Sequence, residues 1–249
     1  MGMFLTLAFL FCIGSMFGWG LEVLFRRFLS AANPERKWIN PGFCTGPYLP
    51  LYGCGLCLMY LIASLEQYRF ITDPFWNQIA VLLLMAIVMT AIEYIAGICS
   101  LKFCKVRLWD YSEEWGNIHG IICPKFSVIW AALGGVYRFL IHPYILNALH
   151  WLSQNLAFSF GIGFFFGVFL IDVAHSLELT AKLKKYAEDN DVIVKFEAVK
   201  EHIRDSRARN AQRIFFFRPF KTERPLREHL NELRESFEKR KPKNKNSAS

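Results

Sequence analysis

Residues 91–124 read AIEYIAGICSLKFCKVRLWDYSEEWGNIHGIICP, and this stretch decides the class of the chain. It opens as the end of an apolar helix with one carboxylate, Glu93, continues as a polar loop, and becomes apolar again after Pro124. A carboxylate inside an apolar helix is costly where it faces lipid, so it is a functional hypothesis by default. Residues 21–47 repeat this layout around Glu22, which predicts two hairpins facing each other across one polar site.

The distribution of charge divides the chain into two parts. Of its 249 residues 53% are hydrophobic, and they are concentrated in the first two-thirds. Residues 1–181 carry 10 basic and 10 acidic side chains, whereas residues 182–249 carry 19 basic and 11 acidic ones and therefore the whole net charge of +8. This asymmetry predicts a transmembrane domain over 1–180 and a basic cytoplasmic helical tail over 181–249.

The apolar runs predict an all-α, polytopic integral membrane protein with five transmembrane helices, because about 20 apolar residues cross a bilayer core. The predicted spans are about 3–25, 51–65, 75–100, 126–141 and 156–176. The second span is short, as expected of a helix that begins below the membrane surface after a re-entrant loop. Such non-helical backbone persists only where protein or water surrounds it.

The connections differ in their Lys and Arg content. Basic residues are concentrated in the connections 26–37 and 102–125 and in the tail, and they are sparse in 66–78 and 143–154. Because cytoplasmic connections are enriched in Lys and Arg, the N-terminus is predicted outside the cell membrane and the C-terminus in the cytoplasm. Both acidic helix ends and both polar loops then lie on the cytoplasmic side.

The two hairpins share their spacing. The intramembrane glutamate precedes a loop tryptophan by 16 residues in both copies, and a loop asparagine precedes a proline by 7 residues in both. These landmarks are Glu22, Trp38, Asn40 and Pro47 in the first copy and Glu93, Trp109, Asn117 and Pro124 in the second. Since the first and third spans have the same orientation, the copies are predicted to be parallel re-entrant repeats.

Polar residues around the two hairpins form the candidate site for a substrate or ion. Its predicted members are Glu22, Glu93, Arg107, Asp110, Tyr111 and Asn117. Two carboxylates that converge in a low dielectric attract a proton or cation, and an arginine can hold an anionic group. The predicted supporting residues are Arg26, Trp38, Asn40, Gly42, Gly46, Pro47, Tyr52 and Trp109.

Structural roles for the same residues stay open. Glu22 can pair with Arg26 at i, i+4, Glu93 can pair with Arg107, and the loop tryptophans can be anchors at the membrane boundary. Gly14 and Gly18 share a helix stripe with Glu22, which favours close packing against protein. Seven scattered cysteines do not indicate a disulfide framework, and no metal or cofactor is predicted. No nucleophile elbow or zinc-protease motif appears, so catalytic residues are unknown and we expect a protein that is not an enzyme.

Several rare motifs recur together in this chain and carry a family resemblance. They are GW-x-x-E at Gly18–Glu22, GF-x-x-GP-x-x-P-x-YG-x-G at Gly42–Gly55, E-Y at Glu93–Tyr94, R-x-WDYS at Arg107–Ser112 and N-x-x-G at Asn117–Gly120. Over about residues 9–145 the sequence resembles the multi-pass ABC-transporter permeases of the CmpB, or ABC-transporter type IV, family. The resemblance implies a transport role. Together with the basic connections, which put the polar site on the cytoplasmic side, it leads us to expect a transporter or permease-like component whose polar site faces the cytoplasm.

The expected partners follow from the residue patterns and from the family resemblance. The lipid bilayer is one, and a separate ATPase subunit is another, because the chain lacks the phosphate-binding sequence G-x-x-x-x-G-K-[ST]. A homo-oligomer is a further expectation, whereas nucleic acid is not, because no binding module is recognisable. Two other functions stay open: an intramembrane enzyme acting on a lipid-linked or phosphate-bearing substrate, and a non-catalytic scaffold that recruits partners through its tail.

The tail is predicted to form helices over 192–214 and 225–240, with a leucine stripe on the second that is suited to docking. The run 215–220, FFFRPF, has a basic surround that suits anionic lipids of the cytoplasmic leaflet. Residues 239–249 are polar and charged, which predicts a disordered end.

Overall fold

The computed structural model describes residues 2–30, 33, 35–65, 71–190, 192–209 and 226–240. Its helices are α1 Met3–Phe28, α2 Pro50–Ser64, α3 Pro74–Cys99, α4 Pro124–Val136, α5 His142–Gln154, α6 Ser159–Asp189, α7 Phe196–Arg209 and α8 Leu226–Arg240. The short elements are π-helical turns at Ser100–Cys104 and Tyr137–Ile141, a 3-10 turn at Leu156–Phe158, and two strands, β1 Val106–Arg107 and β2 Val194–Lys195. The strands pair in parallel.

Four helical segments are long and apolar enough to cross a membrane. They are Met3–Phe28, Pro74–Cys104, Pro124–Gln154 and Leu156–Asp189. The all-α, polytopic architecture therefore stands. The predicted second span, 51–65, corresponds to α2, whose 15 residues extend about 22 Å against a hydrocarbon core of about 30 Å. Five full crossings are not established by helix length.

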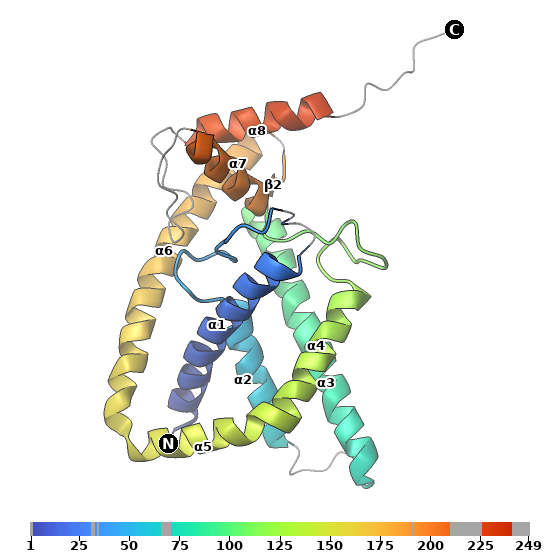
Figure 1. Ribbon diagram of the computed structural model, residues 1–249, viewed down its shortest axis with the longest axis vertical. Coiled ribbons are helices and arrows are strands. Elements are labelled where there is room, and N and C mark those ends of the chain that lie inside the picture. The colour runs from blue at the N-terminus through green and yellow to red at the C-terminus, as the bar shows by residue number, and fades with distance from the viewer. Residues whose placement is uncertain are drawn as a thin grey trace.

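The predicted turn 143–154 is instead the helix α5, and the prediction of a turn there was wrong. α5 lies across one end of the bundle and joins the end of α4 to the start of α6 (Figure 1). Pro143 lacks an N–H and fits the first turn of a new helix, so the chain changes direction at this point. Tyr144 and Trp151 remain exposed on α5, as suits a helix at a membrane boundary.

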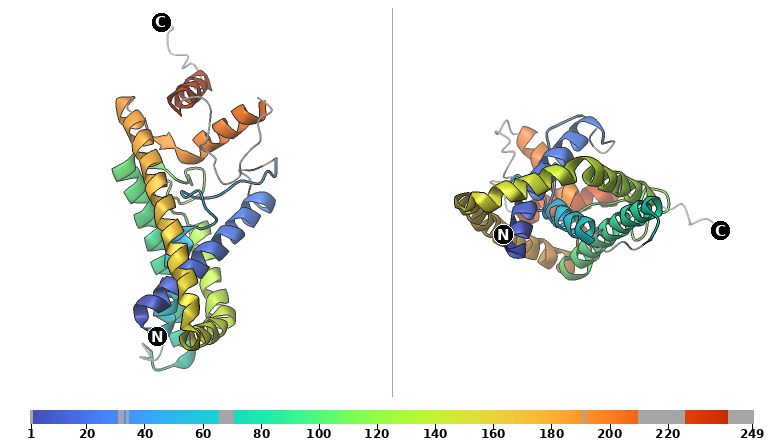
Figure 2. Two further views of the ribbon diagram at one scale, coloured as in Figure 1. Left: turned by 90° about the vertical axis from the view of Figure 1, so that its left-hand side faces the viewer. Right: turned by 90° about the horizontal axis from the view of Figure 1, so that it is seen from below.

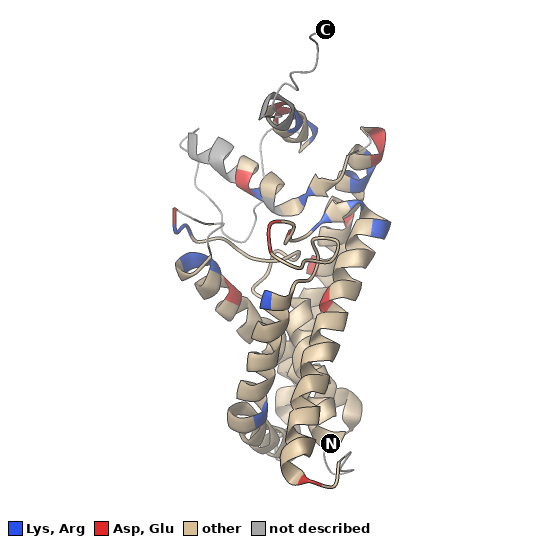
Figure 3. Cartoon of the chain, turned by 90° about the vertical axis from the view of Figure 1, so that its right-hand side faces the viewer, with Lys and Arg blue, Asp and Glu red and all other residues tan. Residues whose placement is uncertain are grey.

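Both polar loops and the tail lie at one end of the molecule. α1, α3 and α6 run toward this end, and α2 and α4 run back from it, so the N-terminus and α5 lie at the opposite end (Figure 1). Lys and Arg are concentrated at the end that carries the tail (Figure 3). The chain thus places its two acidic helix ends on the same side as its basic segments.

α1 and α2 approach closely through glycine. Gly14 and Gly18 are buried, and a Cβ atom added to Gly18 would overlap the side chain of Tyr52. A Cβ on Gly53 of α2 would lie 2.8 Å from the carbonyl oxygen of Phe11. The predicted protein-facing stripe on the first helix is therefore confirmed, because a larger residue at these positions would separate the two backbones.

A proline begins the second helix of each hairpin, because its fixed φ suits the first helical position. Pro50 begins α2 and Pro124 begins α4. The spacing in the sequence pairs Pro47 with Pro124, but α2 begins at Pro50, so the two second helices begin at different distances from the loop asparagine. The parallel repeat remains a prediction.

The tail packs as a unit that includes part of the second loop. α6 runs without interruption through the predicted domain boundary at 180/181 and ends at Asp189 (Figure 2). At its end α6 joins an apolar cluster of buried residues from the second loop and the tail. The members of this cluster are Val106, Leu183, Tyr186, Ala187, Val194, Phe196, Val199, Ile203 and Leu230. The predicted lipid-binding run 215–220 and the predicted disordered end beyond residue 240 lie outside the described residues.

Candidate functional site

Glu93 lies two turns before the end of α3 and is 3% exposed. Its Oε2 accepts a hydrogen bond of 2.9 Å from the indole nitrogen of Trp130, and its Oε1 accepts one of 3.1 Å from the hydroxyl of Tyr111. Both donors are neutral. Within the described part of the chain Glu93 has no ion pair, so the alternative pairing with Arg107 was wrong.

Glu22, near the end of α1, has a different environment. Its Oε1 accepts a hydrogen bond of 2.9 Å from Nε of Arg26, and its Oε2 accepts one of 3.0 Å from the hydroxyl of Tyr52. The Glu22 side chain is 21% exposed. The predicted i, i+4 ion pair is therefore present, and it balances this carboxylate with a positive charge.

A continuous line of polar and aromatic groups joins the two carboxylates. Tyr52, which binds Glu22, packs its ring against Trp130, which binds Glu93, with ring centroids 5.5 Å apart. Burial raises the pKa of Tyr111 above its ordinary value, and the negative charges of Glu93 and Glu22 raise it further. Both carboxylates therefore lie close enough to Tyr111 to influence its pKa, and they belong to one polar region between α1, α2, α3 and α4.

Arg107 and Asp110 belong to a second cluster, directed toward the tail. Nη1 of Arg107 lies 3.1 Å from Oδ1 of Asp110 and donates a hydrogen bond of 3.2 Å to the carbonyl oxygen of His119. Oδ2 of Asp110 lies 2.6 Å from Nζ of Lys195, and its Oδ1 also accepts from the hydroxyl of Ser112. Burial opposes the charge of Asp110, but the bonds from Lys195 and Ser112 outweigh it and lower its pKa to about 2.

Asn117 shapes the second loop and does not touch the carboxylates. Its Oδ1 accepts from the backbone N–H of Gly120, and its Nδ2 donates to the carbonyl oxygens of Ser112 and Glu114. Gly120 has a φ of +66°, a conformation that favours glycine. Its carbonyl oxygen accepts from the backbone N–H of Tyr111 at 2.8 Å, so the turn helps to hold this residue over α3.

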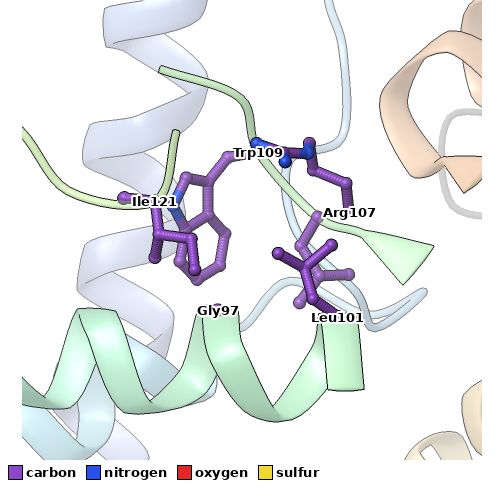
Figure 4. A pocket seen from close by; sticks show the side chains of 6 residues that line it. Gly97, Leu101, Arg107, Trp109 and Ile121 are labelled. Atoms are coloured by element: carbon purple, nitrogen blue, oxygen red, sulfur yellow. Dashed lines mark hydrogen bonds between the residues drawn. The ribbon is translucent and has the colours of Figure 1, made fainter. Parts of the chain in front are cut away.

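Trp109 packs beside the site. Its indole nitrogen donates to the carbonyl oxygen of Ile121 at 2.9 Å. Figure 4 shows the ring beside Ile121, with both side chains over the backbone of α3 at Gly97. The hollow at this place is lined by Gly97, Leu101, Arg107, Leu108, Trp109 and Ile121, and it has no room for a water molecule. Trp109 therefore fills space against α3.

The first loop is held by Asn40 and by α6. Asn40 accepts a hydrogen bond of 2.7 Å from the indole nitrogen of Trp19 and donates one of 2.7 Å to the carbonyl oxygen of Thr45. Asp172 of α6 accepts from the backbone N–H of Gly46 at 2.7 Å and from the hydroxyl of Tyr48 at 2.5 Å. These bonds satisfy irregular backbone that would otherwise be costly near the membrane.

The remaining supporting residues have structural environments. Trp38 is 54% exposed and packs on Phe28, with the guanidinium of Arg27 5.2 Å from its ring, which agrees with an anchor at the membrane boundary. Gly42 has a φ of +83°, and Pro47 is half-buried in the first loop. None of these three contacts a carboxylate in the described interactions.

The tail contacts both loops through one short segment. Lys195 pairs with Asp110 of the second loop, while Lys200 donates to the carbonyl oxygens of Asn40 at 2.8 Å and Gly42 at 3.2 Å in the first. Lys200 is 6% exposed. Phe196, between the two lysines, stacks on Phe43 of the first loop at 6.2 Å.

Sequence reasoning missed four residues that build the site: Trp130, Asp172, Lys195 and Lys200. Asp172 carried the one recognisable signal, because it is an acidic residue inside an apolar helix. Trp130 resembled an ordinary residue of an apolar span, and the two lysines resembled the rest of a basic tail. Their partners lie 37 to 160 residues away along the chain, so no local spacing could have identified them.

Comparison with known proteins gives one family. The model of the family described as "Putative ABC-transporter type IV" matches residues 9–177. The match extends from α1 into α6 and thus includes the last predicted span, beyond residue 145 where the recognisable motifs end. No curated protein and no solved structure matches the chain.

Proposed function

Because the chain belongs to the family described as "Putative ABC-transporter type IV", we propose that it is the permease-like membrane component of a transporter and that Glu93 carries its polar site. A membrane component of such a family works with an ATPase. The chain has no G-x-x-x-x-G-K-[ST] sequence, so we assign the ATPase to a separate subunit. Because Lys and Arg are enriched in cytoplasmic connections, the basic connections favour a topology in the cell membrane in which this site faces the cytoplasm.

The environment of Glu93, buried and bound by two neutral donors, is the observation that carries this proposal. Two neutral donors satisfy its oxygens as hydrogen-bond acceptors, but when this group is ionised it is a buried negative charge with no counter-charge among the residues that the structure describes. Burying such a charge is expensive, and a bound cation or proton would compensate it. The negative charge of Glu22 is already compensated by its ion pair with Arg26. We therefore assign the ion- or substrate-dependent step to Glu93.

The packed interior indicates that passage requires a conformational change. The rings of Tyr52 and Trp130 are in contact between the two carboxylates, and the loops and the tail cover the same end of the bundle. In the alternating-access scheme, one helix hairpin moves against the other around a fixed site. Movement of the α1–α2 hairpin against the α3–α4 hairpin would separate the rings of Tyr52 and Trp130, which are in contact in this structure.

The enzymatic alternative receives less support. It assigned a phosphate group of the substrate to Arg107, but this guanidinium already binds Asp110 and the carbonyl oxygen of His119. The scaffold alternative is favoured by one observation, the docking of the tail on both loops. It predicts that the charge of Glu93 is dispensable.

Replacement of Glu93→Gln tests the proposal. Glutamine keeps the size of the side chain and removes the charge, so we expect activity in a complementation assay to fall by roughly tenfold or more, as for loss of one strong electrostatic interaction. Membrane abundance should stay at the wild-type level. Glu22→Gln should change activity less, because this carboxylate is partly exposed and ion-paired.

Glu178→Gln supplies the inert control, since Glu178 is an exposed residue of α6 paired only with Lys182 among its described contacts. A fully active Glu93→Gln protein at normal abundance would overturn the transport proposal and favour the scaffold. Equal losses in Glu93→Gln and Glu22→Gln would contradict the assignment to Glu93.

A further inference from the structure

We propose that His202, His229 and Glu232 form a binding site for a divalent transition metal, of which Zn²⁺ fits best, between α7 and α8. The site lies in the tail, outside the segment matched by the family, and the inference does not depend on the proposed transport function. Figure 2 shows the two helices at the end opposite the N-terminus.

The three side chains converge from two helices. One possible ligand atom from each lies within 4.8 Å of the others. Nε2 of His202 lies 3.1 Å from Oε2 of Glu232, and the rings of His202 and His229 are 5.5 Å apart at an angle of 76°. Tetrahedral Zn²⁺ with bonds of about 2.0–2.2 Å places its ligand atoms about 3.3–3.5 Å apart. The cluster therefore needs only small side-chain movements to enclose a metal.

The chemistry of the three side chains selects the metal class. Two imidazoles and one carboxylate form a His₂Glu set, which Zn²⁺ uses with a water in the fourth position. Ca²⁺ and Mg²⁺ prefer oxygen ligands throughout, so this set does not suit them. Glu232 is exposed at the edge of the cluster, which leaves a side open for the water, whereas His229 is 2% exposed.

The helices hold the ligands in place. His229 and Glu232 stand three residues apart and therefore share one face of α8. Their neighbour Leu230 is 4% exposed, and Ile203, next to His202, is fully buried in the same apolar cluster. Packing of this cluster fixes the two helices against each other, so the ligands are largely positioned before a metal binds.

A metal here would strengthen the attachment of α8. The described polar contacts of this helix with α6 and its end are the bonds from Tyr186 to Asn231 at 2.9 Å and from Arg234 to Asn190 at 2.6 Å. α7, which carries His202, begins with the segment that contacts both polar loops. The metal would thus join α8 to the part of the tail that covers the loops.

Metal binding by the purified full-length protein in detergent tests the inference. After removal of metals with EDTA, we expect saturable binding of one Zn²⁺ per chain in a titration, and an absorption spectrum of tetrahedral Co²⁺ when Co²⁺ replaces it. Glu232→Gln and His202→Gln should each weaken binding by roughly tenfold or more, since even the loss of an outer-shell partner costs 10–100-fold. Glu235→Gln, an exposed residue one turn further along α8, should bind like the wild type.

The design separates loss of ligands from loss of folding. His229 is buried, so its replacement could unfold α8, whereas Glu232 and His202 are more exposed and their replacements serve as the deciding variants. Zn²⁺ should slow hydrogen exchange in α8 of the wild type and of Glu235→Gln, but not of Glu232→Gln. Absence of saturable binding, or unchanged binding in both deciding variants, would overturn the site.

Discussion

The two acidic hairpins have the same layout in sequence but different electrostatics. In the α1–α2 hairpin, Glu22 is partly exposed and its charge is balanced by Arg26. In the α3–α4 hairpin, Glu93 is buried and both of its described hydrogen bonds come from neutral donors. A similar motif therefore holds one carboxylate in an ion pair, whereas the other has only neutral hydrogen-bond donors among the described residues.

The residue four positions after each glutamate explains this difference. In α1 this residue is Arg26, which reaches back to Glu22. In α3 it is Gly97, whose lack of a side chain admits Ile121 and the ring of Trp109. In the first hairpin this position thus supplies a positive charge for the glutamate, whereas in the second hairpin it leaves room for the loop to pack on the helix.

Gly97→Leu should break the second hairpin and have the largest effect on stability. Even a Cβ atom at this position would overlap Ile121, so a leucine should displace the second loop and cost about 1–3 kcal/mol or more of folding free energy. Thermal unfolding in detergent would measure the loss. Gly163→Leu on α6, where a Cβ would meet nothing within 4 Å, is the matched control. Equal stabilities of the two variants would contradict close packing at Gly97.

Trp130→Phe sharpens the comparison by removing one neutral donor. The phenyl ring cannot donate to Glu93, so the variant should lose about 1–3 kcal/mol, the usual cost of an unsatisfied buried polar group. The same substitution should cost less in a Glu93→Gln background, because the neutral amide is cheaper to leave unpaired. Trp115→Phe, at a tryptophan that is 86% exposed, should be nearly neutral. Additive effects in the double variant would argue against the bond.

Lys195→Gln tests the smallest effect, the charged contact between the second hairpin and the tail. The pKa of Asp110 is lowered from 3.8 to about 2, so its contribution to stability is complete above about pH 4 and is lost as the pH falls toward 2. Because Lys195 is 54% exposed, we expect a change within about 1 kcal/mol. Unfolding temperatures between pH 5 and 2.5 should fall less steeply in Lys195→Gln than in Lys185→Gln, an exposed control on α6. Identical slopes would exclude this contribution.

Part of the structure could be predicted because it depends on neighbours along the chain. The apolar runs gave the membrane class, the i, i+4 rule gave the pair of Glu22 with Arg26, and the glycine stripe gave the packing of α1 on α2. Predictions that depended on the path of a loop were less successful. Arg107 pairs with Asp110 and not with Glu93, and α5 replaces a predicted turn.

Local sequence pattern was sufficient to identify a helical membrane protein with a basic tail, two polar loops and two acidic helix ends. These properties follow from hydrophobicity, charge and helical periodicity, which are local. The three-dimensional fold was needed to see that Trp130 and Tyr111 bind Glu93 and that His202 lies next to His229 and Glu232. Such partners are brought together by the folding of distant segments, and many pairings are compatible with the same local pattern.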